Sequence, residues 1–208
     1  MKTLSATLAI LALSIGTTTC QAGLIVAATA AADGDNAVTC TSAWNFDDQT
    51  MTVTGSQAWG PGHIGTLPLS DAASFTAESE LDPTVTLRTM IDNDTGSSWT
   101  GYQVTVYMNK SFSVTSPTVY NDTTATGWYV SSYDSQAVLV GDVWVANVVF
   151  SGGTAIADGG MLDFSYKLSF LGSVQYCQEM SPVPEPGCLA LIAAGAAGLL
   201  VLRRKRTA

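Results

Sequence analysis

The sequence predicts an all-β protein, an antiparallel β-sandwich of the immunoglobulin-like or jelly-roll kind, with helices only in an N-terminal signal segment and a C-terminal membrane segment. Three observations support this prediction. Apolar and polar residues alternate with period two along several runs, as they do in strands that bury one face. Clusters of Asp, Asn, Gly and Ser separate these runs. No fixed-period repeat is present, which argues against a solenoid or a propeller.

Residues 1–22 have the features of a secretory signal peptide. Met1-Lys2 gives a positive start, and the apolar run from Leu4 to Ile15 is too short to span a membrane comfortably. Cys20-Gln21-Ala22 offers a cleavage site before Gly23, and Ala28-Thr29-Ala30 offers a second one. We expect residues 23–36 to be a flexible start of the exported chain.

Residues 37–180 form the predicted β-sandwich domain, which is long enough to bury a substantial core. The clearest alternation places Leu162, Phe164, Tyr166, Leu168 and Phe170 inward and Asp163, Ser165, Lys167 and Ser169 outward. Residues 85–91 and 102–108 alternate in the same way, and the turn signal Asp92-Asn93-Asp94-Thr95-Gly96 lies between them. We expect roughly eight to ten strands at this spacing.

The chain is acidic, with a formal net charge of −9 at pH 7. Between the two terminal segments the basic residues are Arg88, Lys110 and Lys167, so the exported part is more acidic than the whole chain. Such a surface repels the phosphates of nucleic acids, and we expect no nucleic-acid partner. Solubility is the simplest role of this charge, and contact with cations or polysaccharide is the alternative.

Two cysteines, Cys40 and Cys177, lie near the start and the end of the predicted domain. Export would permit their oxidation, and a disulfide between them would stabilise the fold by about 4–5 kcal/mol in the chain-entropy model. Two separate buried thiols are the alternative. The sequence has no Cys-x-x-Cys motif, so neither a zinc knuckle nor a redox pair is indicated.

The sequence has no pattern typical of a catalytic site. His63 is the single histidine, and no Gly-x-Ser-x-Gly motif accompanies it, so we expect a loop histidine without a catalytic role. Three acidic pairs could serve a glycosidase, namely Asp47/Asp48, Glu78/Glu80 and Asp92/Asp94. Acids in such positions more often form turns or a solvated face. We therefore predict no catalytic residue, no cofactor and no metal ligand.

Two kinds of binding remain as alternatives. Asp33-Gly34-Asp35-Asn36 and the segment 92–96 cluster oxygens that could hold Ca²⁺, but neither completes an EF-hand loop, and Asx turns are the simpler explanation. Exposed aromatic rings could stack on sugars, and the candidates are Trp44, Trp59, Trp99, Trp128 and Trp144. Core packing would explain most of them. Trp128, which follows Gly127, is the best candidate for a loop position.

Residues 181–208 form a tail of three parts. Pro182, Pro184 and Pro186 favour an extended, polyproline-like strip that displays Glu185. The uncharged run 188–202 is the predicted transmembrane helix, about 22 Å long and therefore short for a bilayer core of about 30 Å. The cations that follow are Arg203, Arg204, Lys205 and Arg206, and the positive-inside rule keeps them in the cytoplasm, with the domain outside. A plain membrane anchor with a proline-rich stalk would also fit.

This tail resembles the PEP-CTERM sorting signal of exported bacterial proteins. The resemblance rests on Val183-Pro184-Glu185-Pro186, the apolar run and the basic cluster, in that order. It implies recognition by an exosortase, a membrane-embedded cysteine enzyme, followed by removal of the helix. It also implies transfer to the cell surface or to the extracellular matrix of a Gram-negative bacterium that produces exopolysaccharide. Cys188 stands where a small or hydroxyl residue is expected. Tails of this kind are joined to unrelated domains, so the resemblance implies no activity for the domain.

Together these features favour a non-enzymatic exported protein, anchored in the inner membrane as a precursor and then held at the cell surface or in the exopolysaccharide matrix. The main alternative is a secreted carbohydrate-binding module, with calcium as an assisting ion. An extracellular hydrolase that uses one of the acidic pairs is the third candidate.

Overall fold

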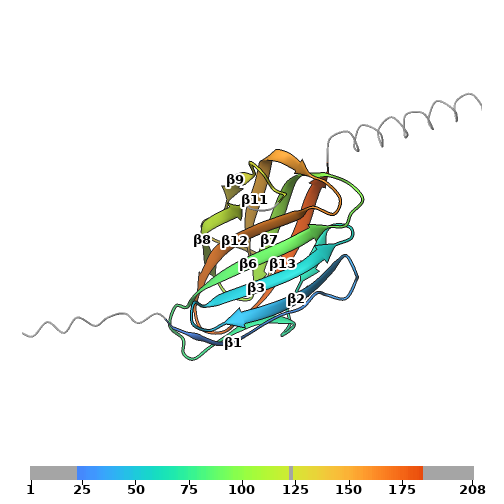
Figure 1. Cartoon of the computed structure of the whole chain (residues 1–208). Coiled ribbons are helices and arrows are strands. Elements are labelled where there is room, and N and C mark those ends of the chain that lie inside the picture. The colour runs from blue at the N-terminus through green and yellow to red at the C-terminus, as the bar shows by residue number, and fades with distance from the viewer. Residues whose placement is uncertain (1–22, 122–123, 185–208) are drawn as a thin grey trace, which may run out of the picture.

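The computed structural model describes residues 23–121 and 124–184. The predicted signal peptide, the predicted transmembrane helix 188–202 and the basic cluster Arg203–Arg206 lie outside these residues. The described chain forms two β-sheets packed face to face and contains strands but no helix (Figure 1). Within the same ranges, no helix is long and apolar enough to cross a membrane.

The first sheet has eight strands and the second has five. The larger sheet runs in the order β1 (Ile25–Ala30), β5 (Ala73–Ala77), β13 (Val174–Pro184), β7 (Trp99–Met108), β11 (Val143–Ile156) and β10 (Val138–Val140), while β4 (Gly62–Ile64) pairs with β13 and β9 (Tyr129–Tyr133) pairs with β11. The smaller sheet runs in the order β2 (Val38–Asn45), β3 (Thr50–Gln57), β6 (Thr84–Asn93), β12 (Met161–Phe170) and β8 (Phe112–Tyr120). The predicted all-β class is confirmed.

One strand pair departs from the predicted antiparallel arrangement. β3 and β6 are parallel, with Thr50 opposite Thr86 and Gln57 opposite Asn93. After β3 the chain contributes β4 and β5 to the larger sheet before it returns as β6, and a crossover of this kind lets two strands enter a sheet from the same end. The thirteen described strands exceed the predicted eight to ten, because β4 and β10 have three residues each and are too short to show an alternation, and β1 lies in the segment predicted to be flexible.

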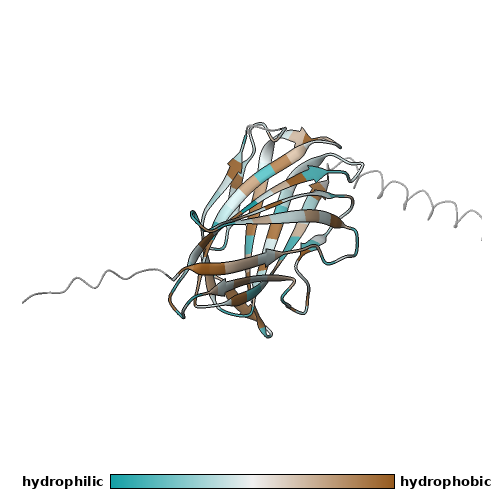
Figure 2. Cartoon of the chain, turned by 60° about the horizontal axis from the view of Figure 1, so that its bottom comes forward, coloured by the Kyte–Doolittle hydropathy of each residue, from teal (hydrophilic) through white to brown (hydrophobic). Residues whose placement is uncertain are grey.

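A continuous hydrophobic core lies between the sheets. Leu162, Phe164, Tyr166, Leu168 and Phe170 are buried, as their alternation predicted. The ring of Phe164 in the smaller sheet lies 4.8 Å from that of Phe150 and 6.0 Å from that of Tyr102, both in the larger sheet. Hydrophobic and hydrophilic positions alternate along the strands of both layers (Figure 2). The aromatic rings of the two inner faces thus hold the layers together.

Two buried glutamines link the sheets by hydrogen bonds. Gln57 accepts a hydrogen bond from the hydroxyl of Tyr102 and donates one to the carbonyl of Met180 at 3.0 Å. Gln178 accepts one from the hydroxyl of Tyr166 at 3.0 Å and donates one to Thr89 Oγ1 at 3.3 Å. A buried amide without these partners would be unfavourable, so each glutamine restricts the sheets to one register.

Burial raises the pKa of Tyr102 well above 10.0, and this makes stability dependent on alkaline pH. The unfolded chain ionises this phenol first, so the contribution is fully present below pH 10 and is lost as the pH rises further. We expect the free energy of unfolding to fall above pH 10 by up to about 1.4 kcal/mol per pH unit for this residue. Tyr102→Phe should flatten that slope in urea titrations, whatever its effect at pH 8. Tyr129→Phe is the control, because Tyr129 is exposed; equal slopes for the two variants would contradict the prediction.

The predicted turn at residues 92–96 carries the chain from one sheet to the other. Asn93 is buried at this corner, and its Nδ2 donates to the carbonyls of Ser97 and Ile156 at 2.8 and 2.9 Å. Its Oδ1 accepts hydrogen bonds from the backbone N–H and the hydroxyl of Thr95. Of the oxygens that this segment could offer to calcium, that of Asn93 therefore forms an Asx turn, the simpler of the two explanations.

Both ends of the described chain are more ordered than expected. The predicted flexible start, residues 23–36, contains β1, which pairs with β5 and buries Ile25. The predicted domain boundary at residue 180 also differs, since β13 continues through Pro184 and stays paired with β7. The reason is the same at both ends: each segment completes the larger sheet, and the hydrogen bonds and buried side chains gained there outweigh the local preference for an irregular chain.

Candidate functional sites

Strand β13 leads directly into the predicted sorting motif. Pro182, Val183 and Pro184 lie opposite Tyr102, Gly101 and Trp99 of β7. The pairing of β13 with β4 ends at Met180, so among the described residues the last part of β13 borders β7 alone. Proline is tolerated at such an edge position because no neighbouring strand needs its missing N–H. The segment predicted to be an extended, polyproline-like strip therefore begins as part of the larger sheet. Glu185 and Pro186 lie outside the described residues.

A pocket of about 290 Å³ adjoins this end of β13. It is lined by Trp59, Gly60, Pro61, Thr95, Ser97, Trp99, Ser181 and Pro182. Among the predicted sugar-stacking residues, only Trp59 is exposed, with 51% of its surface accessible. Trp99 and Trp128 are buried and Trp44 and Trp144 are half-buried. Trp128 lies in the loop before β9, as predicted, but its ring is not exposed to a sugar, because it packs in the core and its indole donates to the carbonyl of Thr154 at 2.7 Å.

Two of the predicted acidic pairs lie far from each other. Asp47 and Asp48 precede the start of β3, whereas Asp92 and Asp94 stand at the end of β6. β3 and β6 are parallel and in register over their length, so the two pairs lie at opposite ends of the smaller sheet. Eight residues of strand span more than about 20 Å, so an acid of one pair cannot work with an acid of the other as the two carboxyl groups of a glycosidase.

A polar cluster forms where the segment after β1 meets the larger sheet. Gly65 donates its backbone N–H to the carbonyl of Ala31 at 2.7 Å, and Asp33 donates its own to the carbonyl of His63 at 3.3 Å. His63 in turn lies opposite Glu179 in the pairing of β4 with β13. Backbone hydrogen bonds thus place the side chains of three distant segments beside one another.

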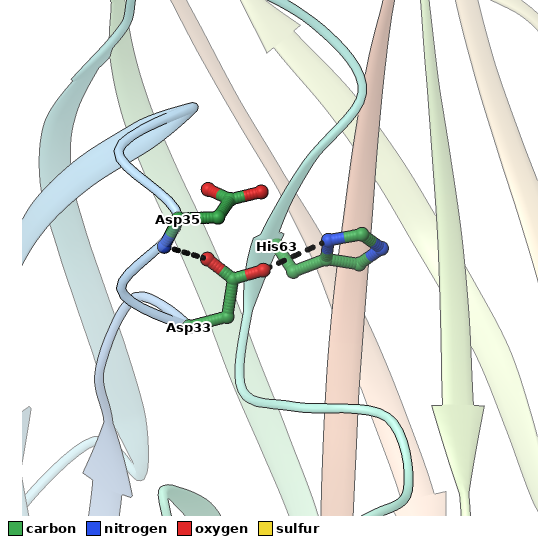
Figure 3. Close-up of side chains that lie close together, drawn as sticks. All are labelled: Asp33, Asp35 and His63. Carbon is green, nitrogen blue, oxygen red and sulfur yellow. Dashed lines mark hydrogen bonds and ion pairs between the residues drawn. The ribbon is translucent and has the colours of Figure 1, made fainter.

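The side chains of this cluster converge on the imidazole of His63 (Figure 3). Asp33 Oδ2 lies 3.1 Å from His63 Nδ1, and Glu179 Oε2 lies 3.6 Å from His63 Nε2. Asp35 joins on the Nδ1 side, and ligand atoms of Asp33, Asp35 and His63 all lie within 4.8 Å of one another. The single histidine is therefore not an isolated loop residue, as the sequence suggested, but the centre of a carboxylate cluster.

The far side of the cluster is anchored by Tyr107. Its hydroxyl donates to Glu179 Oε2 at 2.9 Å. Burial, together with this hydrogen bond and the charge of Glu179, raises the pKa of Tyr107 to about 12. The phenol therefore stays a hydrogen-bond donor at physiological pH and fixes the carboxylate that faces His63 Nε2.

Cys40 and Cys177 are both free thiols, so the structure does not contain the predicted disulfide. Cys40 packs toward the core from β2. In β13, Gln178 points into the space between the sheets, where it bonds Tyr166, so the adjacent Cys177 points to the opposite face. Burial and the charges of Glu179 and Asp33 raise the pKa of the Cys177 thiol to about 12. The structure thus has two separate thiols, the alternative that the sequence left open.

Residues 182–206 match the family model of the PEP-CTERM protein-sorting motif. The chain carries a PEP-CTERM sorting signal. The match spans the motif residues Val183, Pro184, Glu185 and Pro186, the apolar run and the basic cluster, as the sequence predicted. No curated protein and no solved structure matches the chain.

The PEP-CTERM signal implies an exported precursor that an exosortase-type enzyme processes. The structure adds that the signal overlaps the fold, because its first three residues are the last three of β13. The β-sandwich and the PEP-CTERM signal are therefore joined without a linker between them.

Proposed function

We propose that this protein is a non-enzymatic, exported β-sandwich that is processed at its PEP-CTERM motif and then held at the cell surface or in an exopolysaccharide matrix. The observation that carries the proposal is the overlap of the sorting signal with β13. A strand paired in a sheet is a poor substrate for a processing enzyme, so cleavage falls after Pro184. The released product keeps the complete larger sheet.

The N-terminal end supports the same route. Signal-peptide removal before Gly23 would leave β1 intact, whereas cleavage after Ala30 would remove β1 and the buried Ile25. The first of the two candidate cleavage sites thus yields a stable mature protein, and the second removes an entire strand. In this proposal the predicted transmembrane segment 188–202 would hold the precursor in the inner membrane until processing.

The test compares the wild-type protein with Glu185→Ala in a host that has an exosortase-type enzyme. We expect intact mass to show a wild-type product that begins near Gly23, retains Pro184 and lacks Arg203–Arg206, located outside the inner membrane. Glu185→Ala should stay full-tailed in the inner membrane, and Glu78→Ala, an exposed glutamate of the domain, should behave as wild type. If the wild-type protein instead stays in the membrane with Arg203–Arg206 attached, the proposed processing is wrong and the tail is a plain membrane anchor.

Carbohydrate binding is a second candidate, favoured by the exposed ring of Trp59 beside the pocket at the end of β13. Pyranose rings stack on exposed indoles, and the neighbouring Ser97 offers a hydroxyl group to a sugar. The cell fractions prepared for the processing test also test carbohydrate binding. If the mature protein binds the matrix through a sugar, Trp59→Ala should move it from the matrix to the medium without changing its mass.

A further inference from the structure

We propose that Asp33, Asp35 and His63 form a binding site for a divalent transition-metal ion of the zinc type. The three residues supply two carboxylates and one imidazole nitrogen, a ligand set that suits Zn²⁺. They come from the segment after β1 and from β4, and the three ligand atoms already lie within 4.8 Å of one another (Figure 3).

The spacing of the ligand atoms suits a tetrahedral ion. Ligands about 2.0–2.2 Å from zinc lie about 3.3–3.6 Å from each other. Asp33 Oδ2 and His63 Nδ1 are 3.1 Å apart, so this pair needs little movement. The carboxylate of Asp35 is exposed and can close the remaining gap by rotation. Three protein ligands leave one position for water.

The backbone holds both aspartates in place without using all their oxygens. Asp33 Oδ1 accepts the N–H of Asp35 at 3.1 Å, and Asp35 Oδ1 accepts the N–H of Ala37 at 2.7 Å. These two Asx turns restrain the carboxylates through Oδ1 and leave both Oδ2 atoms outside the turns. The site is therefore partly organised before an ion binds, which lowers the free-energy cost of binding.

The second nitrogen of the imidazole has the partner that a metal-bound histidine normally has. His63 Nε2 faces Glu179 Oε2 at 3.6 Å, and Tyr107 fixes that carboxylate from behind. An ion bound at Nδ1 would take the place of the hydrogen bond between Nδ1 and Asp33, and Glu179 would then be the carboxylate nearest to a proton on Nε2. Glu179 belongs to β13, so this neighbour comes from a different segment than the two aspartates.

The local charge also favours a cation. Asp33, Asp35 and Glu179 surround one imidazole, whereas two of the basic residues of the described chain pair elsewhere: Arg88 with Asp163 and Lys110 with Glu80. Calcium fits less well, because it prefers six to eight oxygen ligands and no imidazole. A bound ion would connect the segment between β1 and β2 to β4, the neighbour of the strand that enters the sorting signal.

The single histidine allows a direct test in the full-length chain. We would label the chain with ¹⁵N-histidine, purify it in detergent with a tag that contains no histidine, and add ZnCl₂ at pH 7. We expect the Nδ1 resonance of His63 to shift while Nε2 stays protonated. Asp35→Asn should weaken Zn²⁺ binding at least tenfold, although its amide oxygen can still accept the N–H of Ala37. Asp47→Asn, an exposed control in the β2–β3 turn, should leave binding unchanged.

Thermal unfolding gives a second readout. At a Zn²⁺ concentration 100 times the Kd, the melting temperature should rise by roughly 5–10 °C in wild type and much less in Asp35→Asn or His63→Ala. If the Nδ1 resonance does not move on addition of Zn²⁺, the proposal is wrong. This outcome also covers binding of Zn²⁺ by the cysteine thiols, which would leave His63 unchanged. Equal Zn²⁺ affinities of wild type and Asp35→Asn would overturn it as well, as would stabilisation by Ca²⁺ but not by Zn²⁺.

Discussion

Replacing Arg88 with methionine should lower the free energy of unfolding by about 3 kcal/mol. Arg88 donates from Nε and Nη2 to the two carboxylate oxygens of Asp163, at 3.1 and 2.6 Å. Asp163 lies on the outer face of β12, as the alternation predicted, yet only 2% of its side chain is exposed. The guanidinium covers it and also lies 4.6 Å from the ring centre of Tyr120. Methionine would leave a buried carboxylate without its cation.

Urea unfolding of matched variants measures this effect. Lys167→Met is the control, because Lys167 is an exposed cation on β12, the strand of Asp163, and its loss should change stability by less than about 0.5 kcal/mol. Arg88→Met combined with Asp163→Leu should recover part of the loss, since the double variant removes the uncompensated charge as well. If Arg88→Met and Lys167→Met were equally stable, the buried pair would contribute nothing.

Gly65→Ala should also destabilise the protein by about 3 kcal/mol or more, for a reason of backbone geometry. Gly65 has a φ of +85°, a left-handed conformation that is unfavourable for alanine by about 1–2 kcal/mol. An added Cβ would lie 2.6 Å from the carbonyl oxygen of Tyr176 and 2.9 Å from the Cβ of Ala73. Neither atom can move without disturbing β13 or β5, so the clash adds to the conformational penalty.

Gly96→Ala separates the conformational penalty of a positive φ from the penalty of the steric clash. Gly96 has a φ of +71°, and an added Cβ would meet nothing within 4 Å. Its loss of stability should therefore be about 1 kcal/mol, measured by the same urea titrations. If Gly65→Ala lowers the free energy of unfolding no more than Gly96→Ala does, the backbone around Gly65 can move to accommodate the added Cβ. Because Gly65 follows β4, Gly65→Ala should also displace His63 and weaken Zn²⁺ binding.

Much of the local structure was predictable because it depends on near neighbours in the chain. The inward and outward faces of β12 follow from period-two alternation, and the corner at residues 92–96 follows from its Asn, Asp and Gly. The sorting signal is a linear pattern as well, and residues 182–206 match it without any reference to the fold.

The candidate metal site could not be predicted, because its residues meet only in the folded chain. The sequence drew attention to Asp33-Gly34-Asp35 as an oxygen cluster and to His63 as the single histidine, but nothing in one sequence links positions 30 residues apart. No sequence pattern pointed to Tyr107 or Glu179 as part of a site. Pairing of β4 with β13, and of the segment after β1 with β4, brings them together.

The strand faces and the sorting signal follow from the sequence alone, because both are encoded by residues close together in the chain. Which strands are neighbours is visible only in the folded molecule. The parallel pair β3–β6, the two free thiols Cys40 and Cys177, and the carboxylates around His63 all depend on it. Alternation fixes the face that a side chain occupies, whereas the neighbour of a strand depends on how all the apolar faces are buried at once.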